Sequence, residues 1–64
     1  MTYGTEHSIS KIEAKAWTKE HGARLPRPGQ LVRLVRSNFA RSQGINDMVL
    51  FRRNGQWIIC PVID

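Results

Sequence analysis

The residues best suited to chemistry in this chain are arginines that occur in two pairs. Arg33 and Arg36 lie in the stretch LVRLVRS, and Arg52 and Arg53 stand immediately before an Asn-Gly pair in LFRRNGQWII. A guanidinium group holds its positive charge on a planar fork of donors, which matches phosphate groups and the O6 and N7 edge of guanine. The arginine pattern therefore predicts contact with an anionic partner.

Charge is distributed unevenly along the 64 residues. Ten Lys and Arg residues oppose five Asp and Glu residues, which gives a net charge of +5. A basic segment without acids is typical of proteins that bind a polyanion, most often nucleic acid. No acid lies between Glu20 and Asp47, and this window contains Arg24, Arg27, Arg33, Arg36 and Arg41.

The chain contains no pattern of catalytic or metal-binding residues. It has no cluster of acids, no nucleophile motif and no glycine-rich phosphate loop. His7, His21 and Cys60 do not have the spacing of zinc ligands, and Cys60 in IICPVI is expected to be a small buried residue. We therefore expect a protein that is not an enzyme, with no cofactor, no metal and no small-molecule substrate.

The apolar residues give no indication of a membrane protein. No apolar run approaches the roughly 18 residues that a membrane-spanning helix needs. The N-terminal residues MTYGTEHSIS lack the basic and then apolar order of a signal peptide. A soluble, cytoplasmic protein without a membrane partner is expected.

Three elements are predicted to position the arginines, and the first is a helix over residues 11–21. Ser10 followed by Glu13 fits a capping box, in which each side chain satisfies a backbone amide at the start of a helix. Good helix formers follow, and Gly22 can end the helix in the left-handed conformation.

The second predicted element is an amphipathic helix that starts at Gln30, after two prolines, and ends before Gly44. Apolar residues recur in this segment at a spacing of 3.6 residues. Arg33, Arg36 and Ser37 fall on the opposite side, so the arginines are expected on the outer face of the helix.

The third predicted element is a β-hairpin. The runs DMVLFRR and QWIICPVI are rich in strand-forming residues, and Asn54-Gly55 between them fits a two-residue type I′ turn. Pro61 is expected to limit pairing after Cys60. The arginine tip should project into water. The turn places Arg53 opposite Gln56, Arg52 opposite Trp57, Phe51 opposite Ile58 and Leu50 opposite Ile59.

Two helices followed by a hairpin, carried by IEAKAW, LVRLVRSN and NGQWII, resemble a small winged-helix protein of the phage excisionase type. These proteins are recombination directionality factors, and the chain also resembles compact domains of the MerR kind. The resemblance covers residues 9–60. It implies one α+β domain over residues 1–64, in which a helix-turn-helix-like pair precedes a C-terminal β-hairpin wing.

The resemblance also implies a binding mode. The second helix would enter the major groove, and the wing would reach the DNA backbone or the minor groove. We then expect a sequence-preferring double-stranded DNA-binding protein of a phage or other mobile element, acting in DNA recombination or transcription regulation. Its partners would be an integrase or further copies of the chain on adjacent sites. The implied DNA-binding residues are Arg27, Gln30, Arg33, Arg36, Ser37, Arg52 and Arg53.

Two other functions remain open at this point. A small basic phage or plasmid protein could bind and inhibit a host protein, with Trp57 and Phe51 beside Arg52 as a cluster of binding hot spots. RNA binding is the other alternative, although the sequence shows few aromatic residues and no platform on which bases would stack.

Overall fold

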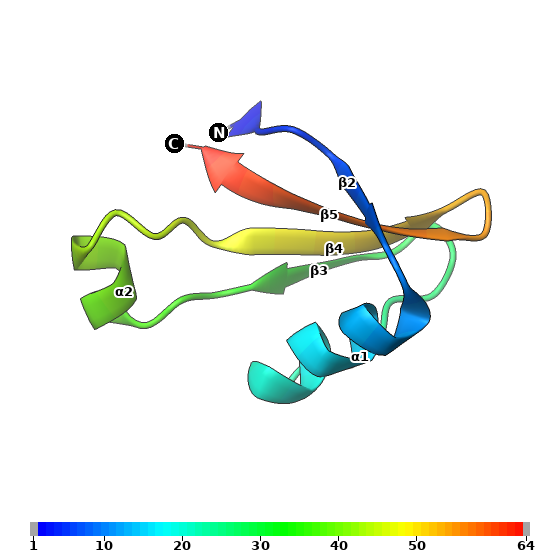
Figure 1. The fold of residues 1–64 in the computed structure, drawn as a ribbon, viewed down its shortest axis with the longest axis horizontal. Coiled ribbons are helices and arrows are strands. Elements are labelled where there is room, and N and C mark those ends of the chain that lie inside the picture. Colours follow the sequence, from blue (N-terminus) through cyan, green and yellow to red (C-terminus); the bar gives the residue numbers. More distant parts are fainter. Residues whose placement is uncertain (1, 64) are drawn as a thin grey trace.

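A computed structural model describes residues 2–63 as a mixed α+β domain dominated by an antiparallel sheet (Figure 1). The end positions 1 and 64 of the predicted domain, and with them the acid Asp64, lie outside the described residues. Neither helix in this range is long and apolar enough to cross a membrane. The elements are β1 (Thr2–Tyr3), β2 (His7–Ile9), α1 (Lys11–Glu20), β3 (Leu31–Leu34), α2 (Asn38–Ser42), β4 (Met48–Arg53) and β5 (Gln56–Ile63).

The sheet is built around β5, its longest strand. One side of β5 pairs with β4, which in turn pairs with β3 at the outer edge. The other side of β5 pairs with β1 and then β2, so the N-terminal segment runs along it in two pieces. All pairings are antiparallel. The C-terminal hairpin is therefore the centre of the sheet, with strands on both sides.

The predicted winged-helix arrangement is wrong. Leu31–Leu34 is not part of a helix but forms β3, with Leu31 opposite Phe51 and Leu34 opposite Met48 on β4. The predicted second helix shrinks to α2, which has five residues and contains none of the predicted arginines. Because no helix covers residues 30–37, the chain has no recognition helix in front of a wing.

A turn before β3 explains this difference. Gln30 donates its backbone N–H to the carbonyl oxygen of Arg27 at 2.9 Å, and Gly29 has a φ of +83°. Pro28 followed by Gly29, between Arg27 and Gln30, is typical of a type II turn, which here reverses the chain ahead of β3. The four residues LVRL fit a strand as well as a helix, so pairing with β4 decides their conformation.

The predictions that a helix begins after Ser10 and that Asn54-Gly55 turns a β-hairpin are confirmed. Ser10 Oγ accepts the backbone N–H of Glu13 at 3.2 Å, and α1 ends at Glu20, before Gly22 with a φ of +66°. Asn54 and Gly55 both have positive φ, and the four expected residue pairs of the hairpin all occur. In both elements, the residues that decide the conformation are close together in the sequence.

The expectation that pairing stops near Pro61 is wrong, because β5 continues to Ile63 and Pro61 lies opposite Met48. The carbonyl oxygen of Pro61 accepts the N–H of Gly4 at 2.9 Å, so the proline nitrogen faces the same side of β5. On this side the register shifts by one residue between β1 and β2. A shift of one residue is a β-bulge, which interrupts the ladder of backbone hydrogen bonds between the strands. The missing N–H of Pro61 is therefore tolerated there.

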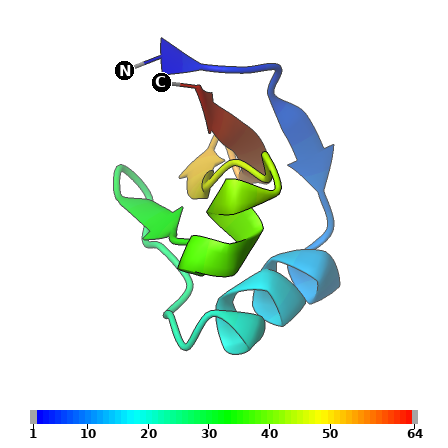
Figure 2. The ribbon, with the colours of Figure 1, turned by 90° about the vertical axis from the view of Figure 1, so that its left-hand side faces the viewer.

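The two faces of the sheet differ in what covers them. On the face that we call the helix face, Leu34, Leu50 and Ile59 pack around Ala14 of α1. Side chains of the opposite face, here called the open face, include Val49, Cys60, Val62 and the partly buried Phe51. Figures 1 and 2 show α1 along only one side of the sheet. Cys60 is buried as predicted, and burial raises the pKa of its thiol.

A substitution at Gly4 tests how closely the N-terminal segment approaches β5. A Cβ atom at this position would lie 2.7 Å from Pro61 Cγ and 3.2 Å from Ile63 Cδ1. We expect Gly4→Ala to lower the free energy of unfolding by about 1–3 kcal/mol, because the proline ring cannot move aside. Urea denaturation measures this change. Thr5→Ala, at the exposed neighbouring position, is the control, and equal stability of the two variants would contradict the prediction.

Candidate nucleic-acid interface

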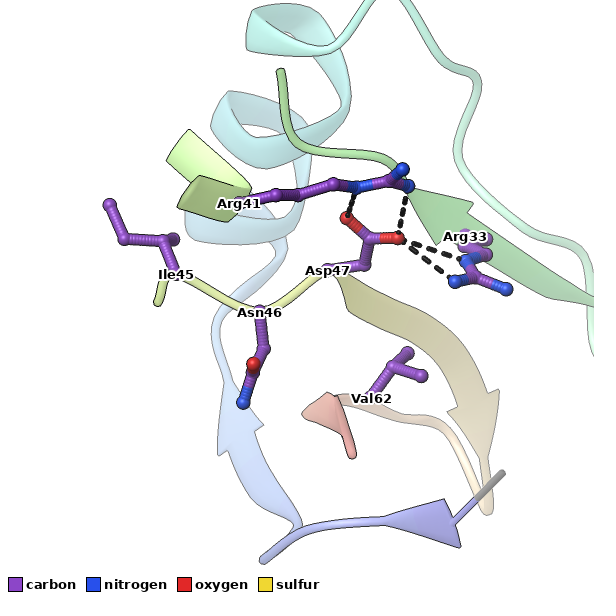
Figure 3. A pocket seen from close by; sticks show the side chains of 6 residues that line it. All are labelled: Arg33, Arg41, Ile45, Asn46, Asp47 and Val62. Atoms are coloured by element: carbon purple, nitrogen blue, oxygen red, sulfur yellow. Dashed lines mark hydrogen bonds and ion pairs between the residues drawn. The ribbon is translucent and has the colours of Figure 1, made fainter. Parts of the chain in front are cut away.

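One buried carboxylate organises the arginines at the α2 end of the sheet. Asp47, immediately before β4, is only 6% exposed. Arg33 of β3 donates to its Oδ2 from Nε at 3.3 Å and from Nη2 at 2.9 Å. Arg41 of α2 donates from Nε to Oδ1 at 3.3 Å and from Nη2 to Oδ2 at 2.8 Å. Figure 3 shows both side chains converging on Asp47.

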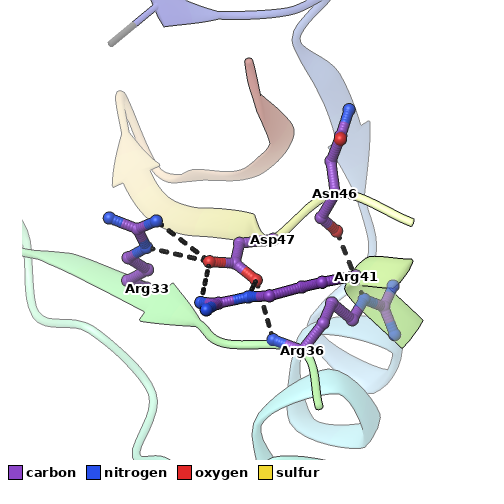
Figure 4. A network of polar contacts seen from close by, with 5 residues as sticks. All are labelled: Arg33, Arg36, Arg41, Asn46 and Asp47. Carbon is purple, nitrogen blue, oxygen red and sulfur yellow. Dashed lines mark hydrogen bonds and ion pairs between the residues drawn. The ribbon is translucent and has the colours of Figure 1, made fainter. Parts of the chain in front are cut away.

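Arg36 joins the same group through its backbone. Its N–H donates to Asp47 Oδ1 at 2.8 Å, and its side-chain Nε donates to the carbonyl oxygen of Asn46 at 3.4 Å (Figure 4). The Arg36 guanidinium also lies 5.1 Å from the ring centroid of Trp17 on α1. We call Arg33, Arg36 and Arg41 around Asp47 the arginine cluster. It connects β3, α1, α2 and β4.

Backbone contacts of the neighbouring segments hold this geometry. Ser37 Oγ accepts the N–H of Ala40 at 3.1 Å, which caps the start of α2. The N–H of Ile45 donates to the carbonyl oxygen of Ala40 at 3.1 Å, after Gly44 with a φ of +82°. The carbonyl oxygen of Asp47 accepts the N–H of Val62 at 2.8 Å, so the acid is also fixed to β5.

Hydrogen bonding keeps Asp47 ionised. Donation from Arg41 is the largest cause that holds the pKa of the Asp47 carboxyl far below its usual range, followed by the N–H of Arg36. Burial acts in the opposite direction, and the bonds from Arg33 add to the lowering. Among the described residues, two guanidinium groups and one backbone N–H therefore surround a carboxylate that is charged at neutral pH.

The arginine cluster is accessible to solvent. The side chains of Arg33 and Arg41 are 38% and 47% exposed, whereas that of Asp47 is buried. Together with Asn46 and Val62 they border a polar hollow of about 230 Å³. The buried carboxylate fixes the orientation of two exposed guanidinium groups, and guanidinium groups can bond an oxyanion such as phosphate in a bidentate manner.

At the hairpin end, the arginines contact other side chains of the domain. Arg53 forms an ion pair with Glu6, with Nη1 and Oε2 3.3 Å apart, and its guanidinium lies 5.5 Å from the ring centroid of Phe51. The pKa of Arg53 is raised, chiefly by its hydrogen bond to Glu6. Arg52 lies 5.3 Å from the ring centroid of Trp57. Residues 52–56 are exposed, as expected for a tip in water, and the two arginines also contact side chains of the sheet and of Glu6.

The structure brings only part of the predicted site together. Arg33 and Arg36 meet at Asp47, whereas Arg53 lies about 13 Å further along the sheet from Arg33, four residues along β4. The strand register places Arg33 and Arg53 on the open face and Arg52 on the helix face. The remaining predicted residues have local contacts: Arg27 and Gln30 close the turn before β3, and Ser37 caps α2.

Two residues of the site were not predicted, Asp47 and Arg41. One signal for Asp47 was present, because it is the single acid between residues 21 and 63. Its partners stand 14, 11 and 6 residues away in sequence, and no spacing rule connects such positions. Among residues 2–63, no group of three His, Cys, Asp or Glu side chains gathers that could hold a metal ion.

Comparison of the chain with protein-family models, curated proteins and solved structures finds no match in any of the three. The relationship to excisionases is therefore not tested and stays a prediction. The winged-helix fold that it implied is the part that the structure contradicts.

Asp47 should make the domain sensitive to acid. The folded-state pKa of this carboxyl lies below its unfolded-state value, so its stabilising contribution is present above about pH 4 and is lost as the pH falls further. We expect Asp47→Asn to lower the thermal midpoint at neutral pH by about 10 °C, because it weakens bonds to two arginines. The variant should also show a flatter loss of stability in acid than the wild type.

Thermal melts followed by circular dichroism, from neutral pH down to about pH 2, measure both effects. Glu20→Gln removes one exposed carboxylate of α1 and serves as the control. A midpoint of Asp47→Asn equal to that of Glu20→Gln at neutral pH would contradict the role assigned to the buried carboxylate.

Proposed function

We propose that the chain binds nucleic acid through the phosphate backbone, with the arginine cluster as the main contact. The observation that carries the proposal is the burial of acidic charge and the exposure of basic charge in residues 21–63. This range contains a single acid, Asp47, and its carboxylate is buried beneath two exposed guanidinium groups. Six of the seven arginines in the range are exposed, and Arg36 is half-buried: Arg24, Arg27, Arg33, Arg41, Arg52 and Arg53 are the exposed ones.

Binding would follow from the charge and from the orientation of the arginines. Guanidinium groups that neutralise phosphates release condensed counterions, and this release supplies most of the sequence-independent affinity for nucleic acid. A guanidinium that is already oriented loses less conformational freedom when it binds. Asp47 fixes Arg33 and Arg41 before any ligand arrives, which supports the arginine cluster over the lysines of α1 as the contact.

The proposal does not include a recognition helix, because the residues assigned to it form β3. Preference for particular sequences or for double-stranded DNA, a role in recombination or transcription, and an integrase or further copies as partners all stay predictions. None of them is needed for contact between arginines and phosphates.

A second candidate function is binding to a host protein, the alternative that the sequence left open. The connection that carries α2 exposes apolar side chains beside the arginine cluster. Phe39 is 76% exposed, and Val35 and Ile45 are exposed as well. Aromatic residues and arginine dominate the hot spots of protein interfaces, so this surface also suits an acidic protein partner.

The salt dependence of binding tests the proposal. If the three arginines of the cluster each contact a phosphate of a duplex, the logarithm of the association constant should fall against the logarithm of salt concentration with a slope of about −2.7. Fluorescence anisotropy with a labelled duplex, between about 50 and 200 mM salt, measures this slope. Absence of binding at the lowest salt concentration would contradict the proposal and favour a protein partner.

A matched pair of variants locates the contact. Arg41→Gln and Lys15→Gln each remove one positive charge, the first from the arginine cluster and the second from the exposed face of α1. We expect Arg41→Gln to reduce the size of the slope by about 0.9, whereas Lys15→Gln leaves it unchanged. Equal effects of the two changes would assign binding to net charge alone. Circular dichroism checks that both variants are folded.

A further inference from the structure

The open face of the sheet contains a second hollow that phosphate binding does not use. It lies toward the hairpin end and has a volume of about 380 Å³, within the range of ligand sites in proteins. Its apolar lining comes from Tyr3, Leu31, Phe51 and Cys60. These residues come from β1, β3, β4 and β5, so the hollow extends across the sheet. We call it the open-face groove.

Apolar and aromatic surface in this groove is exposed to solvent. The strand register places Leu31 and Phe51 side by side, and Tyr3 lies next to Val62 on the other side of β5. Tyr3 is 52% exposed and Leu31 about equally so, although Val49, Cys60 and Val62 on the same face are fully buried. Tyr3 is thus about half exposed at the border of a hollow.

The rim of the groove is polar and can form hydrogen bonds. Glu6 and Arg53 meet there in an ion pair, and the Arg53 guanidinium lies over the ring of Phe51. Gln30 adds an amide. Carboxylate, amide and guanidinium groups together present donors and acceptors of the kinds that read the edges of bases, and both aromatic rings and guanidinium planes stack on the faces of bases.

Arg33 of the arginine cluster lies on the same face as the groove. Arg33 and Leu31 are two residues apart on β3, so their side chains point to the same side about 7 Å from each other. Arg33 belongs to the cluster and Leu31 borders the groove. A nucleic-acid strand with a phosphate at Arg33 therefore has the groove within reach of its neighbouring units.

We propose that the open-face groove takes an unpaired base of single-stranded DNA or RNA, stacked against Tyr3, while the arginine cluster holds the backbone. This inference rests on the proposed function and specifies its ligand. In a duplex the faces of the bases are covered by their neighbours, so only an unpaired base can present its face to a side chain on a sheet. Cationic surface for the backbone together with aromatic side chains for the bases is how single strands are bound without sequence preference.

The test compares four labelled oligomers of about 12 units by fluorescence anisotropy at one salt concentration: oligothymidylate, oligouridylate, a duplex, and an abasic strand that keeps the phosphates but has no bases. We expect the two single strands with bases to bind roughly tenfold or more tightly than the abasic strand and the duplex. A difference between thymidylate and uridylate shows whether DNA or RNA is preferred, and either preference supports the proposal.

Variants of Tyr3 test the stacking contact. Tyr3→Ala should weaken binding of oligothymidylate by roughly 5- to 100-fold and leave the abasic strand unaffected. Tyr3→Phe keeps the ring and should retain affinity. Thr5→Ala, in the same N-terminal segment, is the matched control.

The outcomes separate this inference from the function on which it rests. If the abasic strand binds as tightly as oligothymidylate, or if Tyr3→Ala binds as the wild type does, the groove takes no base and only backbone binding remains. If none of the four oligomers binds at low salt, the proposed function itself fails, and the groove is then open to an apolar segment of a protein partner.

Discussion

The structure depends on one interaction, the group of hydrogen bonds that Asp47 accepts while it is buried. A carboxylate removed from water is costly unless its oxygens are fully bonded, and here five donations from three arginines meet this demand. Because those arginines come from β3, from the following connection and from α2, the same bonds close the end of the sheet. The position of α2, which has no buried residue of its own, follows from this single acid.

Local and distant determinants separate clearly along the chain. The start of α1 at Ser10 and the turn at Asn54-Gly55 could be predicted, because the residues that decide them are adjacent in sequence. The conformation of Leu31–Leu34 could not, because it is decided by pairing with β4, and the preceding Pro28-Gly29 turn does not distinguish a strand from a helix. The arginines were identified from composition, but the acid that groups them was not.

The two faces of the sheet differ in what packs against them. On the helix face, α1 contributes the small side chains Ala14 and Thr18, which allow a close approach to the sheet over Leu50 and Trp57. On the open face, Val49, Cys60 and Val62 are buried although no helix lies across it. We propose this face as the ligand site because its backbone groups are already paired in the sheet.

The edge position of β3 has a consequence for behaviour at high concentration. Within residues 2–63, this strand pairs with β4 on one side and has no strand on the other. Unpaired edges recruit strands of other molecules and begin aggregation, and proteins discourage this with short strands and charged side chains. β3 is only four residues long and contains Arg33, so it has both of these features. The guanidinium that Asp47 holds in place thus also sets a charge on the edge strand, which discourages the domain from assembling with itself through that edge.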